Sequence, residues 1–233
     1  MGSSLIPLLK DANWTVQAPP SSQVNILEPE KLLTFLESFK PSVVLHLAAY
    51  TDVASAEQQK DLCWKINVEG TRNVARAANA LGARMVHISS DYVFDGERGN
   101  YLETDTPNPS NYYSLTKVVA EEAARAAQDV LIVRTSFKES VWRYQVAFMD
   151  QFTSADYVDV IAQELCLLLS HLGSVQTQVL NLVTMRKSIF ELAIQRNPTV
   201  QPGSRLNAKV HIPPDVSLNI SQWQELKQSF KLA

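Results

Sequence analysis

Short apolar runs spaced along the first half of the chain constrain its fold most. Val43–Leu47, Met85–Ser89 and Val130–Arg134 are mostly apolar, and longer segments with helical spacing separate them. Apolar runs without strict alternation are typical of parallel strands buried on both faces. Strands that alternate with helices predict an α/β fold with a mostly parallel, doubly wound sheet.

The remaining elements follow from periodicity and capping patterns. We expect helices at residues 2–11, 29–39, 56–81, 113–127, 157–172, 188–195 and 221–231, and further strands at 15–18 and 179–183. Ser188 and Glu191 form a capping-box pattern, and Ser221 is expected to cap the last helix. Residues 197–220 are expected to be irregular. We therefore expect residues 1–135 to form the main α/β part. Residues 136–233 should form a smaller lobe that returns elements to the sheet, in one continuous unit.

Composition and charge exclude several classes of protein. Twenty-one basic and 24 acidic side chains give a net charge of −3 at pH 7 without a block of like charge. This balance argues against nucleic-acid partners and anionic membrane surfaces. Cys63 and Cys166 lie in helical segments, so we expect no disulfide framework and a reduced, cytoplasmic setting. His46 and His87 are interpreted as core residues, and we expect no metal site.

Three polar residues carry the candidate chemistry. Tyr113 and Lys117 are four residues apart and share a helix face, and Ser90 ends a strand-like run. A nearby ammonium favours phenolate, so we expect the Tyr113 pKa to lie below its usual value of about 10. Such a phenol exchanges a proton with a carbonyl or carbinol, and the serine hydroxyl is suited to hold the same oxygen. The pattern predicts a carbonyl/alcohol redox site.

The segment from Val43 to Glu122 resembles the extended short-chain dehydrogenase/reductases, and within them the dTDP-4-dehydrorhamnose reductase family. The matching stretches are Leu47–Asp52, Asn67–Asn73, His87–Gly96, Tyr101–Pro109 and Tyr113–Lys117. The resemblance implies a Rossmann-like sheet, an N-terminal dinucleotide-binding part and a C-terminal substrate-side lobe. It also implies NADPH or NADH as cofactor and a nucleotide-sugar ketone as substrate.

The resemblance also implies residue roles. Tyr113 would donate the proton to the ketone, and Ser90 would hold the carbonyl oxygen. Lys117 would lower the Tyr113 pKa and bind the nicotinamide ribose, and Asn67 would steady the structure behind the site. The implied cofactor-binding residues are Gly2, Asn25, Ile26, Ala48, Ala49 and Tyr50, together with Tyr113 and Lys117. Whether the protein forms a homodimer is left open.

The start of the chain departs from the family pattern. The family opens with a strand and a Gly-x-x-Gly-x-x-Gly turn, which lets the backbone approach the cofactor pyrophosphate. Here Met1-Gly2-Ser-Ser-Leu5 matches the helix after that turn. Three interpretations stay open: a start codon assigned too late, which we favour, a truncated copy, or a short relative with altered cofactor binding. In a stable short form, the strands beside the absent one would have to pair with each other.

The sequence does not determine which nicotinamide cofactor or which sugar the protein would bind. Neither an acidic residue nor an arginine follows Thr15–Ala18, so NAD is not distinguished from NADP. Phe137–Trp142 and Pro213–Leu218 differ from the family pattern, which leaves the sugar undetermined. We favour a reductase. The alternatives are a non-catalytic sugar-nucleotide-binding or regulatory subunit on the same fold, and an epimerase or dehydratase of the superfamily.

Overall fold

A parallel sheet forms the centre of the protein. The computed structural model describes residues 1–208 and 211–231. The sheet order is β1-β2-β3-β8, and every neighbouring pair is parallel. The strands are β1 (Val43–His46), β2 (Arg84–Ser90), β3 (Val130–Thr135) and β8 (Val179–Asn181). This arrangement confirms the predicted α/β, Rossmann-like fold class.

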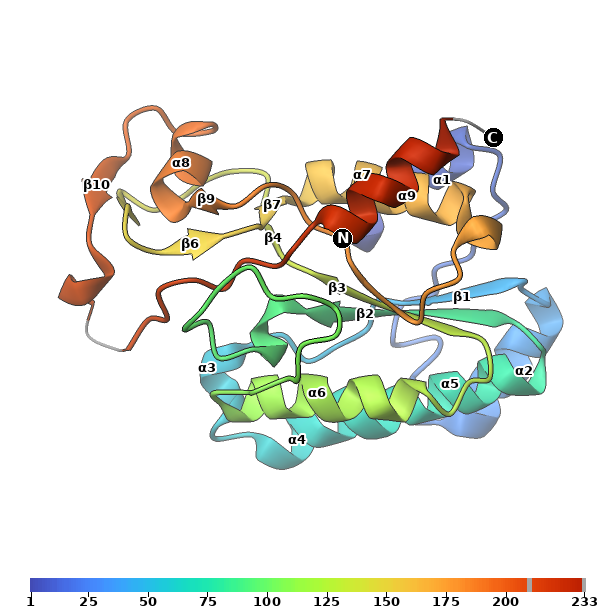
Figure 1. Ribbon diagram of the computed structural model, residues 1–233. Helices are drawn as coiled ribbons and strands as arrows, with labels where there is room; N and C mark the ends of the chain where they lie inside the picture. Colours follow the sequence, from blue (N-terminus) through green and yellow to red (C-terminus); the bar gives the residue numbers. More distant parts are fainter. Residues whose placement is uncertain (209–210, 232–233) are drawn as a thin grey trace.

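Helices cover both faces of this sheet (Figure 1). One face carries α1 (Gly2–Asp11), α7 (Val158–Ser170) and α9 (Ser221–Phe230). The other carries α2 (Pro29–Phe39), α3 (Val53–Ala56), α4 (Lys60–Trp64), α5 (Thr71–Ala80) and α6 (Tyr112–Ala124). Among the described residues, no helix is long and apolar enough to cross a membrane.

Each face of the sheet has its own apolar core. Leu131 and Val133 of β3 pack toward α1, α7 and α9, where Trp223 is nearly inaccessible to solvent. Ile132 and Met85 point to the opposite face and pack with α2, α5 and the end of α6. The alternation of side chains along buried strands explains why these strand sequences are continuously apolar.

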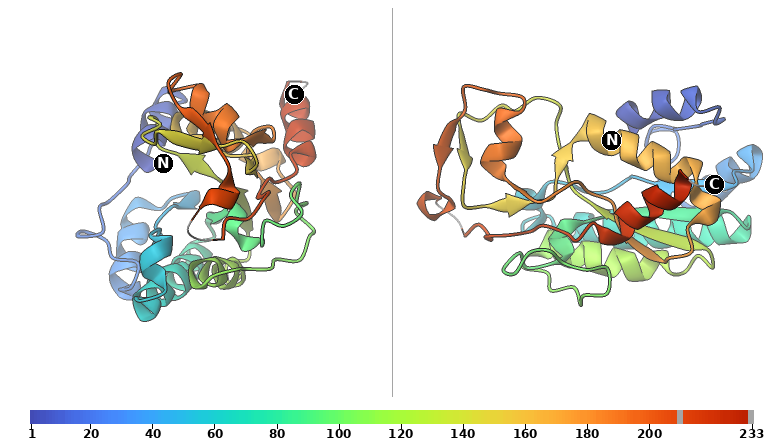
Figure 2. Two further views of the ribbon diagram at one scale, coloured as in Figure 1. Left: turned by 90° about the vertical axis from the view of Figure 1, so that its left-hand side faces the viewer. Right: turned by 45° about the horizontal axis from the view of Figure 1, so that its top comes forward.

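The second half of the chain adds short ladders at one end of the molecule (Figure 2). The paired strands are β4 (Phe137–Lys138) with β7 (Asp156–Tyr157), β5 (Val146–Phe148) with β10 (Gln201–Gly203), and β6 (Phe152–Thr153) with β9 (Lys187–Ser188). The helix α8 (Ile189–Ile194) follows β9, and the predicted capping box of Ser188 and Glu191 is confirmed. Residues 209–210 of the expected irregular segment, and residues 232–233, lie outside the described residues.

Three expectations about local structure are wrong. Thr15–Ala18 forms no strand and does not pair with β1, so the structure does not show the pairing that a stable short form would require. The helix expected at residues 56–81 is interrupted by a turn and then by a π-helical turn at Lys65–Gly70. Ser221 lies inside α9 and makes no capping hydrogen bond, because Ile220 occupies the cap position.

Candidate active site

The ends of β2 and β3 form the floor of the candidate site. Ser90 lies opposite Thr135 in the parallel register. Beyond Ser90, the chain turns sharply through the short 3-10 turn Asp91–Val93. The Ser90 hydroxyl accepts a hydrogen bond from the Tyr92 amide at 3.2 Å and donates one to Asp91 Oδ1 at 3.0 Å. The turn therefore fixes the hydroxyl at the carboxyl end of the sheet.

Tyr113 reaches the site from the first turn of α6. The side chain of Asn111 caps this helix by accepting a hydrogen bond from the Ser114 amide at 2.8 Å. This cap fixes where the helix begins, and so where Tyr113 projects. Tyr113 is 8% exposed and packs against Ala56 and Cys63. The Ser90 hydroxyl lies near enough to the phenol to lower its pKa.

The electrostatics of Tyr113 differ from the expectation. Burial raises the pKa of the phenol above its ordinary value, and the nearby Asp91 carboxyl raises it further, whereas the hydrogen bond with Ser90 opposes the rise. Burial also raises the pKa of Asp91, against the opposing hydrogen bond of Ser136. The expected lowering of the Tyr113 pKa by Lys117 is therefore wrong for this structure, because desolvation of the phenolate dominates.

Lys117 lies one helical turn beyond Tyr113 and is 4% exposed. Its ammonium donates a hydrogen bond to the Ile88 carbonyl of β2 at 2.8 Å. Burial lowers the Lys117 pKa to about 8, while Glu121 opposes the shift. The side chain thus carries a positive charge for most of the time at neutral pH, directly beside the strand that ends in Ser90.

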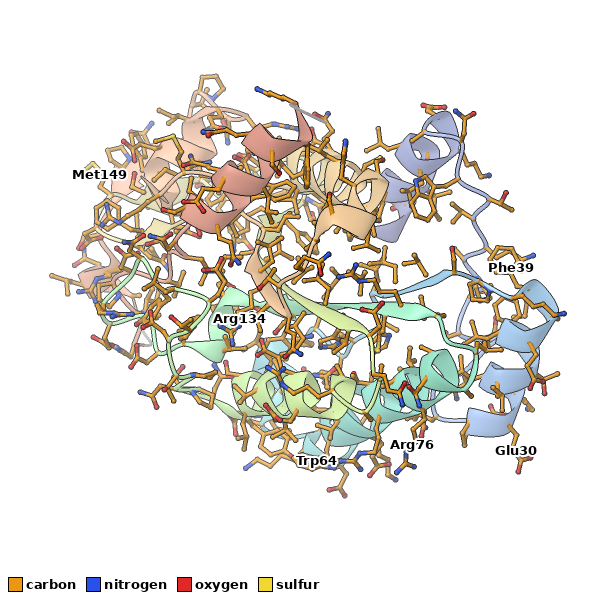
Figure 3. The ribbon with its side chains drawn as sticks, turned by 45° about the vertical axis from the view of Figure 1, so that its right-hand side comes forward. Glu30, Phe39, Trp64, Arg76, Arg134 and Met149 are labelled. Atoms are coloured by element: carbon orange, nitrogen blue, oxygen red, sulfur yellow. The ribbon has the colours of Figure 1, made fainter. Side chains whose placement is uncertain are left out.

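A buried ion pair fastens α6 to the sheet. Arg134 donates to both carboxylate oxygens of Glu121, at 2.9 and 2.8 Å, and Ser89 donates to the same carboxylate at 2.6 Å. Both charged side chains are 4% exposed. Arg134 lies in the middle of the molecule (Figure 3). The pair connects the ends of β2 and β3 to the helix that carries Tyr113 and Lys117.

Asn67 supports the loop that follows β1. Its side-chain oxygen accepts from the Tyr50 amide at 2.8 Å, and its Nδ2 donates to Thr116 Oγ1 at 2.9 Å. Asn67 lies within the π-helical turn that interrupts the expected long helix. The widened turn therefore places an amide behind the site, in agreement with the steadying role expected for Asn67.

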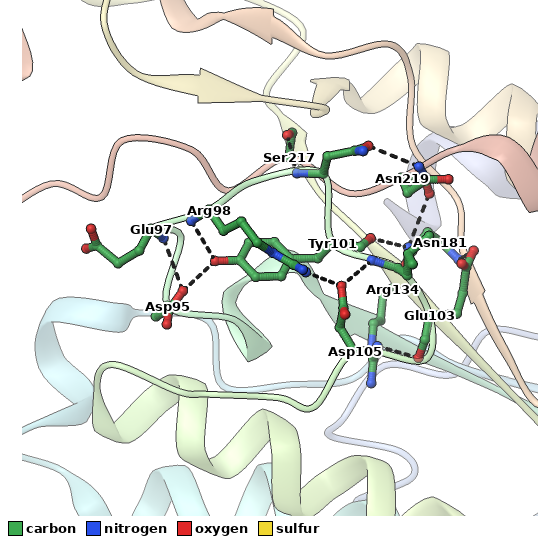
Figure 4. Close-up of polar contacts among 12 residues, drawn as sticks. Asp95, Glu97, Arg98, Tyr101, Glu103, Asp105, Arg134, Asn181, Ser217 and Asn219 are labelled. Carbon is green, nitrogen blue, oxygen red and sulfur yellow. Dashed lines mark hydrogen bonds and ion pairs between the residues drawn. The ribbon is translucent and has the colours of Figure 1, made fainter.

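The loop after β2 docks on the C-terminal lobe (Figure 4). The Tyr101 amide donates to the Ser217 carbonyl at 3.0 Å, and Asn181 Nδ2 donates to the Tyr101 carbonyl at 2.9 Å. Gly99 has a φ of +72°, and a Cβ there would lie 2.2 Å from the Asp215 carboxyl carbon. Only glycine allows this close approach, which joins the loop to the lobe.

Five of the eight implied cofactor residues line one cavity of 590 Å³, whereas Tyr50, Tyr113 and Lys117 do not belong to its lining. Those lining it are Gly2, Asn25, Ile26, Ala48 and Ala49. Tyr50 lies just beyond this lining and is held by Asn67. The structure therefore brings the start of α1 and the segment after β1 to the same cavity. The sequence alone does not show that these two segments are neighbours, because they are far apart along the chain.

Two residues of the site were missed by sequence reasoning. Asp91 follows Ser90 directly, and an acidic residue just after a predicted strand could have indicated it. Glu121 lies four residues beyond Lys117 and eight beyond Tyr113, and thus on the same helix face. The periodicity of the helix therefore indicated Glu121. Its partner Arg134 lies on β3, and only the fold shows that the two side chains pair.

Comparisons with known proteins agree with this architecture. The chain is 35% identical over 130 residues to methionine adenosyltransferase 2 subunit beta of Rattus norvegicus, which covers 53% of the chain and 39% of that protein. It is 35% identical over 140 residues to dTDP-4-dehydrorhamnose reductase of Aggregatibacter actinomycetemcomitans, covering 59% of the chain and 48% of that protein. The matches thus span about half or less of these relatives.

Among solved structures, dTDP-4-dehydrorhamnose reductase of Bacillus anthracis in complex with NADP superposes with a TM-score of 0.84 and 25% identity. The superposition covers 97% of this chain and 88% of that one. The sequence profile described as the RmlD substrate binding domain matches residues 1–164. The parallel sheet, the strand-end site and this match agree, and the chain belongs to the RmlD substrate-binding-domain family.

Proposed function

We propose that this chain reduces the ketone of a nucleotide-linked sugar, with NADPH or NADH as hydride donor, in the manner of a short-chain dehydrogenase/reductase. The observation that carries the proposal is the position of buried Tyr113 near Ser90, which lowers its pKa, with Lys117 one helical turn further along α6. The similarity to a reductase crystallised with NADP supports it. The dTDP-linked 4-dehydro-6-deoxyhexose of rhamnose synthesis is the proposed substrate.

The proposed acid–base step follows from the geometry. A bound NADPH or NADH supplies a hydride to the carbonyl carbon. The Ser90 hydroxyl turns its single hydrogen from Asp91 Oδ1 to the carbonyl oxygen. Tyr113 transfers its proton to that oxygen, so the ketone becomes a secondary alcohol. Because burial raises the Tyr113 pKa, the phenol is protonated at neutral pH, as a proton donor must be. A proton from solvent then restores the phenol.

The residues around the cavity fit the adenosine end of the cofactor. Ala48 and Ala49 offer small side chains after β1, and Asn25 and Ile26 line the same cavity from across. Gly2 places the N-terminus of α1 at this cavity, where backbone amides favour a phosphate. We propose that Lys117 uses a further N–H donor for the nicotinamide ribose, since an ammonium has three donors.

The test compares two neighbouring tyrosines. Tyr113→Phe removes the proposed proton donor, and we expect turnover to fall by about 10² to 10⁴. Tyr112→Phe is the matched control, because that ring lies under the Lys60 ammonium, 5.2 Å from its centroid. NADPH oxidation with the nucleotide-linked ketose is followed by absorbance, and circular dichroism checks the fold. Turnover by Tyr113→Phe at the Tyr112→Phe rate would show that Tyr113 is not the donor.

The second candidate function is a non-catalytic subunit. The similarity to methionine adenosyltransferase 2 subunit beta favours it, because that relative is named as a subunit. In this role, the chain binds a nucleotide or a partner enzyme without consuming cofactor. An NADPH fluorescence titration combined with the oxidation assay separates the two roles. Saturable binding without turnover on nucleotide sugars supports the subunit, and turnover supports the reductase.

A further inference from the structure

Asp91 is a buried carboxyl group that contacts a residue of the candidate site. Its side chain is 3% exposed and lies in the short 3-10 turn after β2. Ser90 Oγ lies 3.0 Å from Asp91 Oδ1. We propose that Asp91 acts as a neutral acid, which donates a hydrogen bond to Ser90 Oγ and so directs the Ser90 hydrogen to the ketone oxygen. This inference rests on the proposed function, and it makes Asp91 a positioning residue for Ser90.

The hydrogen-bond capacity of Ser90 determines which form of Asp91 the reaction needs. A serine hydroxyl has one hydrogen to donate and two lone pairs that accept. The Tyr92 amide occupies one lone pair at 3.2 Å. A carboxylate at Asp91 has no hydrogen, so it retains the Ser90 hydrogen on its own oxygen. A carboxylic acid at Asp91 donates to the second lone pair, and the Ser90 hydrogen is then free for the ketone.

The surroundings of Asp91 favour the neutral acid. Asp91 takes part in none of the ion pairs that the described residues form. Burial without a paired cation disfavours the carboxylate and raises the pKa of Asp91 above its ordinary value. Hydrogen bonding by Ser136 and the positive charge of Lys138 oppose this rise, and Ser90 opposes it less.

The segment after β3 brings two of these groups to Asp91. Thr135 ends β3 beside the end of β2, and the chain stays extended into β4. Alternate residues of an extended chain lie on the same side. Ser136 and Lys138 therefore share one side, toward Asp91, whereas Phe137 points the other way and is 37% exposed. Lys138 thus supplies a positive charge near Asp91 without pairing with it.

The acid form of Asp91 also favours proton donation by Tyr113. The titratable side chains that face Asp91 are Tyr92 of its own turn, Lys138 of β4 and Tyr113 of α6. As a carboxylate, Asp91 raises the pKa of Tyr113 and makes the phenol a weaker acid. Protonation of Asp91 removes that negative charge. One protonation event therefore frees the Ser90 hydrogen and strengthens the proton donor.

The proposed role predicts the pH dependence of hydride transfer. Below the Asp91 pKa, the acid form directs the Ser90 hydrogen to the ketone, and the rate is at its maximum. Above that pKa, the carboxylate retains the hydrogen, and the rate falls. Burial lowers the Lys117 pKa to about 8, so loss of that positive charge should add a separate fall in the wild type and in every Asp91 variant.

The first arm of the test measures single-turnover oxidation of NADPH by the nucleotide-linked ketose over a range of pH. Asp91→Asn imitates the neutral acid, because an amide always has hydrogens to donate to Ser90. We expect this variant to keep the wild-type maximum rate and to lose the fall at the Asp91 pKa. Asp91→Ala has no donor, and we expect its rate to fall by about tenfold, as for one lost hydrogen bond. Circular dichroism checks the fold of each variant.

A matched substitution outside the site provides the control. Asp129 is 63% exposed and pairs with Arg84 at the opposite end of the sheet from Ser90. We expect Asp129→Asn to keep the wild-type rate and the complete pH profile.

The second arm measures the protonation of Asp91 without turnover. The protein is labelled with carbon-13 at its aspartate carboxyl carbons and titrated by NMR, and the Asp91 signal is the one that Asp91→Asn lacks. We expect its midpoint to lie above the ordinary value of 3.8, whereas the pKa of the surface residue Asp150 is lowered by its hydrogen bond from Ser204.

Three results would overturn the proposal. They are an Asp91 midpoint at or below its ordinary value, a loss of rate in Asp91→Asn equal to that in Asp91→Ala, and a fall of the Asp91→Asn rate with pH at the wild-type Asp91 midpoint. Wild-type protein that transfers no hydride at any pH would contradict the proposed function instead. The NMR titration distinguishes the two failures, because it needs neither cofactor nor sugar.

Discussion

The phenol of Tyr113 is held in its protonated form by its surroundings. Its ring is nearly buried and Asp91 adds negative charge nearby, and both effects raise the pKa of the phenol against the opposing effect of Ser90. Sequence spacing predicted the shared face of Tyr113 and Lys117 correctly. It did not predict the direction of the pKa shift, because desolvation depends on what packs over the ring. That packing includes Cys63, which is distant in the sequence.

Two buried histidines predict how stability depends on pH. His46 and His87 stack with ring centroids 5.4 Å apart, which confirms that both are core residues. Burial lowers the pKa of His46 to about 3 and lowers that of His87 well below its ordinary value. Between pH 6.5 and 3, the unfolded chain therefore binds more protons than the folded chain. The free energy of unfolding falls with falling pH, by about 1.4 kcal/mol per pH unit for each histidine.

The variant His46→Gln isolates one of these contributions. Its side-chain amide can replace the contact of His46 with Thr71, which is 3.0 Å long. We expect the slope of the unfolding free energy between pH 4 and 6 to decrease by about 1.4 kcal/mol per pH unit. Urea unfolding at a series of pH values measures it. An unchanged slope would mean that His46 does not enter the folded core as a neutral group.

Helix α6 determines the geometry of the site, because one face of it carries three of the polar residues. Tyr113, Lys117 and Glu121 follow each other at intervals of four. The helix is fixed at its start by the Asn111 cap and further along by the pair of Glu121 with Arg134. A change in the ion pair therefore alters both the stability of the protein and the position of Tyr113.

The Glu121–Arg134 pair predicts a large loss of stability on substitution. Glu121→Gln leaves the Arg134 guanidinium buried without a compensating charge, and we expect a loss of about 3 to 5 kcal/mol in the free energy of unfolding. Glu122→Gln is the matched control, because Glu122 is 72% exposed and pairs with Arg125 on the surface. We expect that change to be within about 0.5 kcal/mol. Equal effects in urea unfolding would contradict the structural role of the pair.

The sequence predicted elements well where local rules decide them. Pro29–Phe39 forms the expected helix, and Ser188 with Glu191 forms the expected capping box. Thr15–Ala18 did not form its expected strand, since strand formation requires a hydrogen-bonded neighbour. The expected helix at residues 56–81 is divided because tertiary contacts of Asn67 with Tyr50 and Thr116 override helical propensity.

The molecule combines the proposed acid–base site with a large apolar cavity beside β1. Ser90, Tyr113 and Lys117 come from β2 and α6, whereas the cavity extends from the segment after β1 along β1 itself. The division of the chain at residue 135 into a cofactor part and a substrate part stays a prediction, as does the cytoplasmic setting. The parallel sheet follows the predicted fold class, and it places Ser90 and the segment after β1 at the carboxyl ends of neighbouring strands.

Isotope transfer tests the central claim most directly. The full chain is incubated with the nucleotide-linked 4-ketose and NADPH that carries deuterium at the transferred position of the nicotinamide. We predict one deuterium bound to carbon in each molecule of the product alcohol, matched by equal consumption of NADPH, as mass spectrometry and absorbance will measure. Folded protein that binds NADPH but forms no deuterated alcohol would contradict the claim that this chain is a reductase.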